Sequence, residues 1–117
     1  MEDHKIWADE TIKKIRHKMA WVSEKNKDKI PCTTDREGNY DDRSDQSRNW
    51  RIDDGINCWT NGFWGGMMWL MYQDTGEERY AGIARRLEEK LDRCFDAYYG
   101  LHHDAGFMFV PTAVTDF

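Results

Sequence analysis

Two short stretches of the sequence carry side chains whose types and spacing could do chemistry. In the first, residues 101–107, the carboxylate of Asp104 follows the imidazoles of His102 and His103 and stands two positions before Gly106. A positioned carboxyl can act as a general acid or base and typically contributes about 10²–10⁴ in rate. Aspartates in turns more often cap the next element or accept hydrogen bonds from backbone amides, so the sequence leaves both roles open for Asp104.

The same three residues also raise the question of a metal site, because imidazole and carboxylate groups are common Zn²⁺ ligands. Adjacent side chains point in different directions, however, and rarely bind one ion. We therefore expect no metal at His102, His103 and Asp104. The cysteines are odd in number and far apart, which predicts free thiols rather than a disulfide framework or a CxxC metal site. They are Cys32, Cys58 and Cys94.

The second stretch, residues 59–72, is rich in aromatic and methionine side chains. Large rings at helical spacing usually belong to the core, and we expect this for Phe63 and Trp69. Trp59 differs because it stands at the end of a polar loop, where an exposed ring can stack on the apolar face of a sugar. The residues alone leave a core role and a sugar platform equally open for Trp59.

Glycines interrupt this aromatic stretch at positions 62, 65 and 66. A glycine inside a helix costs up to about 1 kcal/mol relative to alanine. That cost is reasonable where another backbone or a ligand must come close, so we expect a close neighbour on this side of the helix.

Hydrophobic periodicity predicts the helix that opens the chain. Apolar residues three and four apart predict a helix over residues 4–26 with one buried stripe, which Trp7 extends by a turn. The stripe consists of Ile12, Ile15, Met19 and Val22.

Two further helices are predicted around the aromatic stretch. Residues 60–74 are apolar on nearly every side, which predicts a helix with neighbours all round. Residues 77–99 have one apolar and one charged face, and Gly100 is well placed to end that helix. Residues 112–117 resemble the opening of another helix, and no segment alternates like a sheet for more than four residues. The predicted fold class is all-α, built from antiparallel helical hairpins.

A long polar segment separates the first helix from the aromatic stretch. Residues 26–58 contain Pro31, Gly38 and a run of aspartates and arginines, with few apolar side chains. Loops of this length are often functional, so we expect this loop on the side of the functional site.

Composition excludes several classes of function. The chain of 117 residues is 39% apolar, which fits one folded domain. Its net charge of −5, with acids and bases interspersed, argues against nucleic-acid and anionic-membrane partners. The first residues lack the apolar region of a secretory signal, and no apolar run approaches the roughly 18 residues of a membrane span. We expect a cytoplasmic protein.

The two stretches together resemble a known family. Residues 59–66, Trp-Thr-Asn-Gly-Phe-Trp-Gly-Gly, are followed by Trp-Leu-Met-Tyr-Gln-Asp-Thr-Gly at 69–76 and His-His-Asp-Ala-Gly-Phe at 102–107. In this order and spacing they resemble the N-terminal part of the unsaturated glucuronyl hydrolases, glycoside hydrolase family 88. The resemblance covers roughly residues 50–117.

The resemblance implies both a fold and an activity. The fold is an (α/α)6 barrel of helical hairpins, of which residues 1–117 would be one partial domain. The activity is hydration of the 4,5 double bond of an unsaturated glucuronic acid at the non-reducing end of oligosaccharides made by polysaccharide lyases. No metal or organic cofactor is implied.

The resemblance also implies roles for single residues. Asp104 matches the first of the family's two essential aspartates, Trp59 matches the tryptophan that lines the sugar subsite, and His103 lies beside them. The second aspartate, the family's general acid and base, lies beyond this chain. We therefore expect the isolated chain to be inactive, and either to pack against the remainder of the barrel or to self-associate.

Two alternatives remain at this point. One is an unsaturated rhamnogalacturonyl hydrolase-like enzyme with the same fold and chemistry, although the turn at residues 102–107 favours the glucuronyl group. The other is a small helical sugar-binding or interaction module without catalysis.

Overall fold

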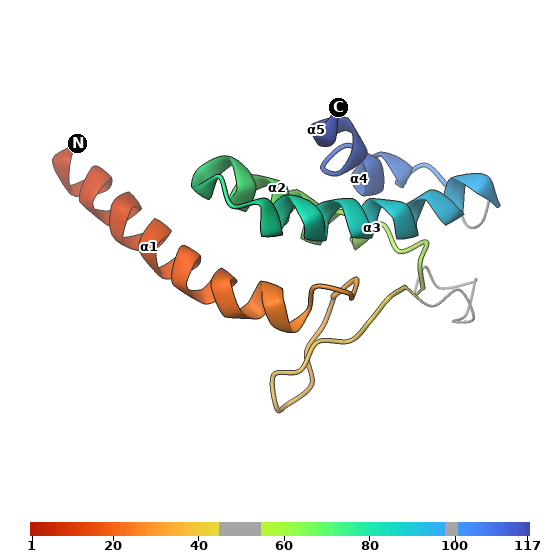
Figure 1. Cartoon of the computed structure of the whole chain (residues 1–117), viewed down its shortest axis with the longest axis horizontal. Coiled ribbons are helices and arrows are strands. Elements are labelled where there is room, and N and C mark those ends of the chain that lie inside the picture. Colours follow the sequence, from red (N-terminus) through yellow and green to blue (C-terminus); the bar gives the residue numbers. More distant parts are fainter. Residues whose placement is uncertain (45–54, 98–100) are drawn as a thin grey trace.

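The computed structural model describes residues 1–44, 55–97 and 101–117. These residues form helices and no strand, so the all-α prediction is confirmed for the described part of the chain. The five helices are α1 (Glu2–Lys25), α2 (Asn61–Thr75), α3 (Glu78–Asp96), α4 (Ala105–Phe109) and α5 (Ala113–Asp116) (Figure 1).

The centre of the fold is a hairpin of α2 and α3, which lie side by side (Figure 1). The turn between them depends on Gly76, which has a φ of 70° and donates its N–H to the carbonyl of Tyr72 at 2.7 Å. Trp69 Nε1 also donates to Glu88 Oε1 at 2.7 Å and so joins the two helices. This arrangement confirms the predicted helical hairpin.

The amphipathic prediction for α3 is confirmed by its buried face. Tyr80, Ile83, Ala84, Leu87, Leu91 and Cys94 are all buried. Burial raises the pKa of the Cys94 thiol to about 11. The predicted terminator Gly100 lies outside the described residues.

The glycines of α2 lie against the C-terminal segment of the chain. A β-carbon at Gly62 would lie 2.3 Å from the carbonyl oxygen of Met108 and 2.5 Å from that of Phe107. At Gly65 it would lie 2.7 Å from Thr112 Cγ2, and at Gly66 it would lie 2.8 Å from Pro111 Cβ. The predicted close neighbour is therefore confirmed: it is the backbone of α4 at Gly62 and the side chains of Thr112 and Pro111 at Gly65 and Gly66.

The rest of α2 differs from the sequence prediction. Trp64, Met68 and Met71 are buried on one side, but a second stripe of Phe63, Met67 and Leu70 is exposed. Within the described chain, neighbours cover one side of α2, and for Met67 and Leu70 the expectation of neighbours all round stays a prediction.

The buried stripe predicted for α1 is confirmed only at its C-terminal end. Met19 and Val22 are buried, whereas Ile12, Ile15 and Trp7 are exposed, Trp7 by 67%. Figure 1 shows that the N-terminal part of α1 extends past the end of the hairpin of α2 and α3. The bidentate ion pair between Arg16 and Asp74, with both N–O distances at 2.7 Å, still ties α1 to the end of α2.

Aspartates organise the described part of the predicted loop. Asp41 Oδ1 accepts hydrogen bonds from the N–H groups of Cys32 and Thr33, both at 2.9 Å. Asp42 Oδ1 accepts from the N–H of Ile30 at 3.0 Å. Residues 26–44 contain no helix or strand, only an isolated bridge between Thr34 and Tyr40. Carboxylates thus supply the partners that regular structure would give to these backbone groups.

No helix in the described ranges combines the length and the apolar character that a membrane crossing requires.

The glycine contacts give a first prediction. Replacing Gly62 by alanine should lower the free energy of unfolding by about 1–3 kcal/mol, the usual cost of overpacking, because its β-carbon would meet backbone oxygens that cannot rotate away. Gly82→Ala is the matched control, since its β-carbon would meet only Arg86 Nη1 at 3.6 Å. Alanine at that α3 position should stabilise by up to about 1 kcal/mol. Urea denaturation of both variants measures the difference, and equal midpoints would contradict the close packing.

Candidate functional site

Asp104 lies at the N-terminal end of α4, in a turn held by its own backbone. Ala105 donates its N–H to the carbonyl of His102, and Phe107 donates to the carbonyl of Asp104, both at 3.0 Å. Asp104 occupies the N-cap position, yet its side chain makes no capping hydrogen bond. Of the structural roles that the sequence left open, the carboxylate of Asp104 therefore does not fill that of a helix cap.

The two histidines surround the Asp104 carboxylate. Oδ2 lies 3.5 Å from His103 Nε2 and 3.9 Å from His102 Nδ1. The Asp104 N–H donates to His102 Nδ1 at 3.1 Å, which orients that ring. The Asp104 side chain is 33% exposed and that of His103 is 90% exposed. A carboxylate with one face toward imidazoles and another toward solvent can exchange protons with a bound molecule.

Three aromatic rings form an exposed surface next to this turn, which we call the aromatic patch: Trp59, Phe63 and Phe107. The ring centroids of Trp59 and Phe107 are 5.5 Å apart, and those of Trp59 and Phe63 are 5.7 Å apart. Each ring packs edge to face on its neighbours, a favourable arrangement for aromatic pairs. Their exposed fractions are 40%, 42% and 51%.

The sequence predictions for these rings have mixed outcomes. Trp69 is in the core as predicted, whereas the core prediction for Phe63 is wrong, because that residue lies on the uncovered stripe of α2. Phe107 was not singled out as an aromatic neighbour of Trp59. The sequence does contain a signal for the contact between Trp59 and Phe63, since these positions are four apart and share one side of the helix start. The contact of Gly62 with the backbone of Phe107 brings in the third ring.

The position of Trp59 is held by the residues around it. The Asn61 side-chain amide donates to the carbonyls of Gly55 and Ile56, at 3.0 and 2.9 Å. The Thr60 hydroxyl lies 3.2 Å from Cys58 Sγ and 3.6 Å from Cys32 Sγ. All three cysteines are free thiols, as predicted. The first part of the loop therefore contacts the residue that follows Trp59.

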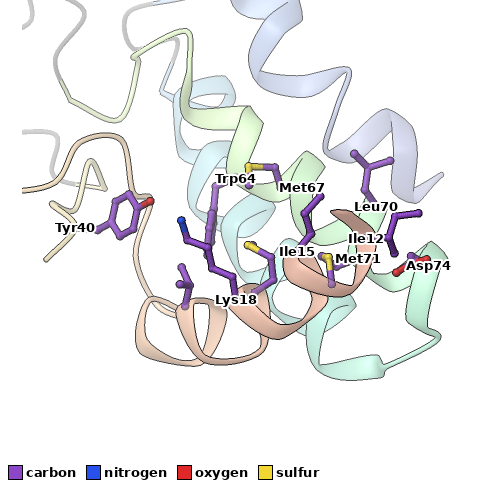
Figure 2. A pocket seen from close by; sticks show the side chains of 11 residues that line it. Ile12, Ile15, Lys18, Tyr40, Trp64, Met67, Leu70, Met71 and Asp74 are labelled. Carbon is purple, nitrogen blue, oxygen red and sulfur yellow. The ribbon is translucent and has the colours of Figure 1, made fainter. Parts of the chain in front are cut away.

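A separate apolar groove of about 560 Å³ lies between α1 and α2 (Figure 2). Its lining includes Ile12 and Ile15 of α1 and Met67, Leu70 and Met71 of α2, and its charged side chains are Lys18 and Asp74. None of the predicted site residues lines it. Its wall is largely apolar, and the carboxylate of Asp74 at its edge is already paired with Arg16.

Comparison with known proteins identifies relatives for part of the chain. It is similar to the unsaturated glucuronyl hydrolase of Bacillus sp. (strain GL1), with 39% identity over 71 residues, 60% of this chain and 19% of that protein. It is also similar to the unsaturated chondroitin disaccharide hydrolase of Streptococcus pneumoniae, with 35% identity over 60 residues, 50% of this chain and 15% of that protein. The corresponding protein of Streptococcus agalactiae serotype III is 33% identical over 60 residues, 50% of this chain and 15% of that protein.

These similarities confirm the resemblance to the unsaturated glucuronyl hydrolases as a partial match. The match spans less than a fifth of the length of these relatives. No protein-family model matches the chain, and no solved structure matches it.

The exposure of Trp59 gives a second prediction, with Trp64 as its matched control. Trp64 is 6% exposed, and its loss to alanine should cost about 3–5 kcal/mol. Trp59→Ala should cost about 1–2 kcal/mol, because it removes two edge contacts between exposed rings. Denaturation curves of the two variants test this order, and an equal loss from both would make Trp59 a core residue.

Proposed function

We propose that the full-length protein is an unsaturated glucuronyl hydrolase-like enzyme. It would hydrate the 4,5 double bond of an unsaturated glucuronic acid at the non-reducing end of an oligosaccharide. The observation that carries this proposal is that the carboxylate of Asp104, which makes no capping hydrogen bond, lies in the same turn as Phe107 of the aromatic patch. The chain is also 39% identical to such a hydrolase over 71 residues.

Asp104 is the catalytic carboxyl of the proposed site. In the reaction a proton adds to C4 and a water-derived hydroxyl adds to C5, and the resulting hemiketal collapses to release the sugar as a keto acid. Such an addition needs a carboxyl group to handle the proton and activate the water. The second carboxyl of the proposed mechanism is supplied by a part of the protein outside this chain, and no metal or organic cofactor takes part.

Trp59 and His103 are the substrate-binding residues of the proposed site. An exposed indole can pack on the apolar face of a pyranose ring, and Phe63 and Phe107 widen the surface available to the sugar. The ring of His103 lies beside Asp104 and is almost fully exposed, so it can donate a hydrogen bond to a sugar hydroxyl.

The proposed scaffold is an (α/α)6 barrel whose first hairpins are formed by this chain. Residues 1–117 would be one partial domain, with the loop 26–58 on the side of the site. The hairpin of α2 and α3 is consistent with this architecture. Further hairpins would cover Met67 and Leu70 of the exposed stripe and the apolar groove beside them, and would leave Phe63 open to the sugar.

The names of the relatives favour one substrate class over the alternatives. Relatives from Streptococcus are named unsaturated chondroitin disaccharide hydrolases, and the Bacillus relative is named for the glucuronyl group. We therefore place an unsaturated uronic-acid disaccharide ahead of a rhamnogalacturonan fragment. The alternative is a module that binds sugar without catalysis, and activity assays distinguish it from the enzyme.

The first test concerns Asp104. Asp104→Asn in the full-length protein should lower turnover of an unsaturated glucuronyl disaccharide by about 10²–10⁴, because the amide cannot exchange the proton. Loss of the absorbance of the conjugated double bond measures the rate. Asp92→Asn on the exposed side of α3 is the matched control and should keep wild-type turnover. Wild-type turnover by Asp104→Asn would contradict the assignment, and no turnover by the wild type would favour the binding module.

The second test concerns the chain alone. The isolated 117 residues should self-associate and leave the disaccharide unhydrolysed, because the exposed stripe of α2 and the groove form a continuous apolar surface. Leu70→Glu, at a position 65% exposed in that groove, should reduce self-association. Val114→Glu, equally exposed on α5, should not. Sedimentation velocity measures the association, and a monodisperse monomeric wild type would contradict the proposed partial domain.

A further inference from the structure

Three possible metal-ligating atoms converge at the turn before α4. One ligand atom from each of His102, His103 and Asp104 lies within 4.8 Å of the other two. The sequence argument that adjacent side chains point apart does not hold here. The turn that ends in the hydrogen bond from Ala105 to His102 folds the three residues back on one another.

Two of the separations between these atoms are close to those of a transition-metal site. Two ligands about 2.0–2.1 Å from a tetrahedral Zn²⁺ lie about 3.3–3.5 Å from each other. Asp104 Oδ2 is 3.5 Å from His103 Nε2 and 3.9 Å from His102 Nδ1. The ligand nitrogens of the two histidines lie within 4.8 Å of each other, up to about 1.5 Å farther apart than on one tetrahedral ion, so a rotation of the exposed His103 ring is needed to bring all three groups onto one ion.

The ligand set and its exposure indicate the kind of ion. Imidazole nitrogen suits Zn²⁺, Cu²⁺ and Ni²⁺, whereas Mg²⁺ and Ca²⁺ prefer oxygen ligands. The Nδ1 of His102 accepts the N–H of Asp104, so this atom already presents its lone pair within the cluster. A metal bound at Nδ1 would replace that N–H as its partner.

We propose that His102, His103 and Asp104 form a binding site for a divalent transition-metal ion of the Zn²⁺ class. The ion takes two imidazole nitrogens and one carboxylate oxygen from the protein, and water fills the remaining position. Because the site is open on the His103 side, the ion exchanges with solvent and is not a permanent structural element.

A consequence for activity rests on the proposed function. A Zn²⁺ ion bound to Asp104 occupies the carboxylate that the hydration reaction needs, so it should inhibit the enzyme. The ion is in this sense a reversible inhibitor and not a cofactor.

The test is calorimetric titration of the full-length protein with Zn²⁺, in a Cys32→Ser background that removes the exposed thiol as a competing ligand. We expect one equivalent to bind at this site, and His103→Gln should weaken its binding at least about tenfold. His17→Gln, an exposed histidine of α1, is the matched control and should leave that binding unchanged. Mg²⁺ should give no comparable binding. His102→Gln, with its fold checked by circular dichroism, should weaken Zn²⁺ binding as His103→Gln does.

Each contrary result overturns the proposed metal site. Unchanged Zn²⁺ affinity in His103→Gln, an equal loss in His17→Gln, or equal binding of Mg²⁺ would each do so. Zn²⁺ binding that depends on His103 without inhibition of an active wild type supports the metal site. That result would instead count against Asp104 as the catalytic carboxyl, so the two proposals fail separately.

Discussion

The close contact between the glycines of α2 and the segment from Phe107 to Thr112 is the constraint on which the candidate site depends. Gly62 admits the carbonyl groups of Phe107 and Met108 to distances that no β-carbon would allow. The contact fixes the position along α2 at which the C-terminal segment crosses this helix. The turn at residues 102–107 and the start of α2 are distant in sequence, and this crossing brings Phe107 against Trp59.

The same contact explains why the helix tolerates residues that weaken it. Glycines at 62, 65 and 66 reduce the intrinsic stability of the N-terminal half of α2. In an isolated helix, replacing any of them by alanine would increase helix stability. In the folded chain they allow Thr112 and Pro111 to pack directly on the helix, where Thr112 is fully buried. Packing against a second segment therefore stabilises α2 more than local propensity does.

Several features of the fold could be predicted from the sequence because local pattern determines them. The apolar face of α3 follows from its spacing, and the close approach at Gly62 follows from the cost of glycine inside a helix. Features that depend on the presence of a partner could not be predicted in this way. The apolar stripe of α1 and the residues Phe63 and Leu70 of α2 have helical spacing, but spacing does not say whether another element covers them. Ile12 and Ile15 face α2 across an open groove and are not covered by it.

The candidate site shows the same division between local and long-range information. The turn around Asp104 could be located from its residue types, but whether its carboxylate caps α4 depends on side-chain geometry that spacing does not determine. The side chain leaves the cap unmade and faces the histidines, while the turn is held by backbone hydrogen bonds. A carboxylate that is not needed to hold its own turn is available to a ligand. In the proposed site the backbone therefore positions Asp104, and the aromatic patch would supply the surface against which that ligand rests.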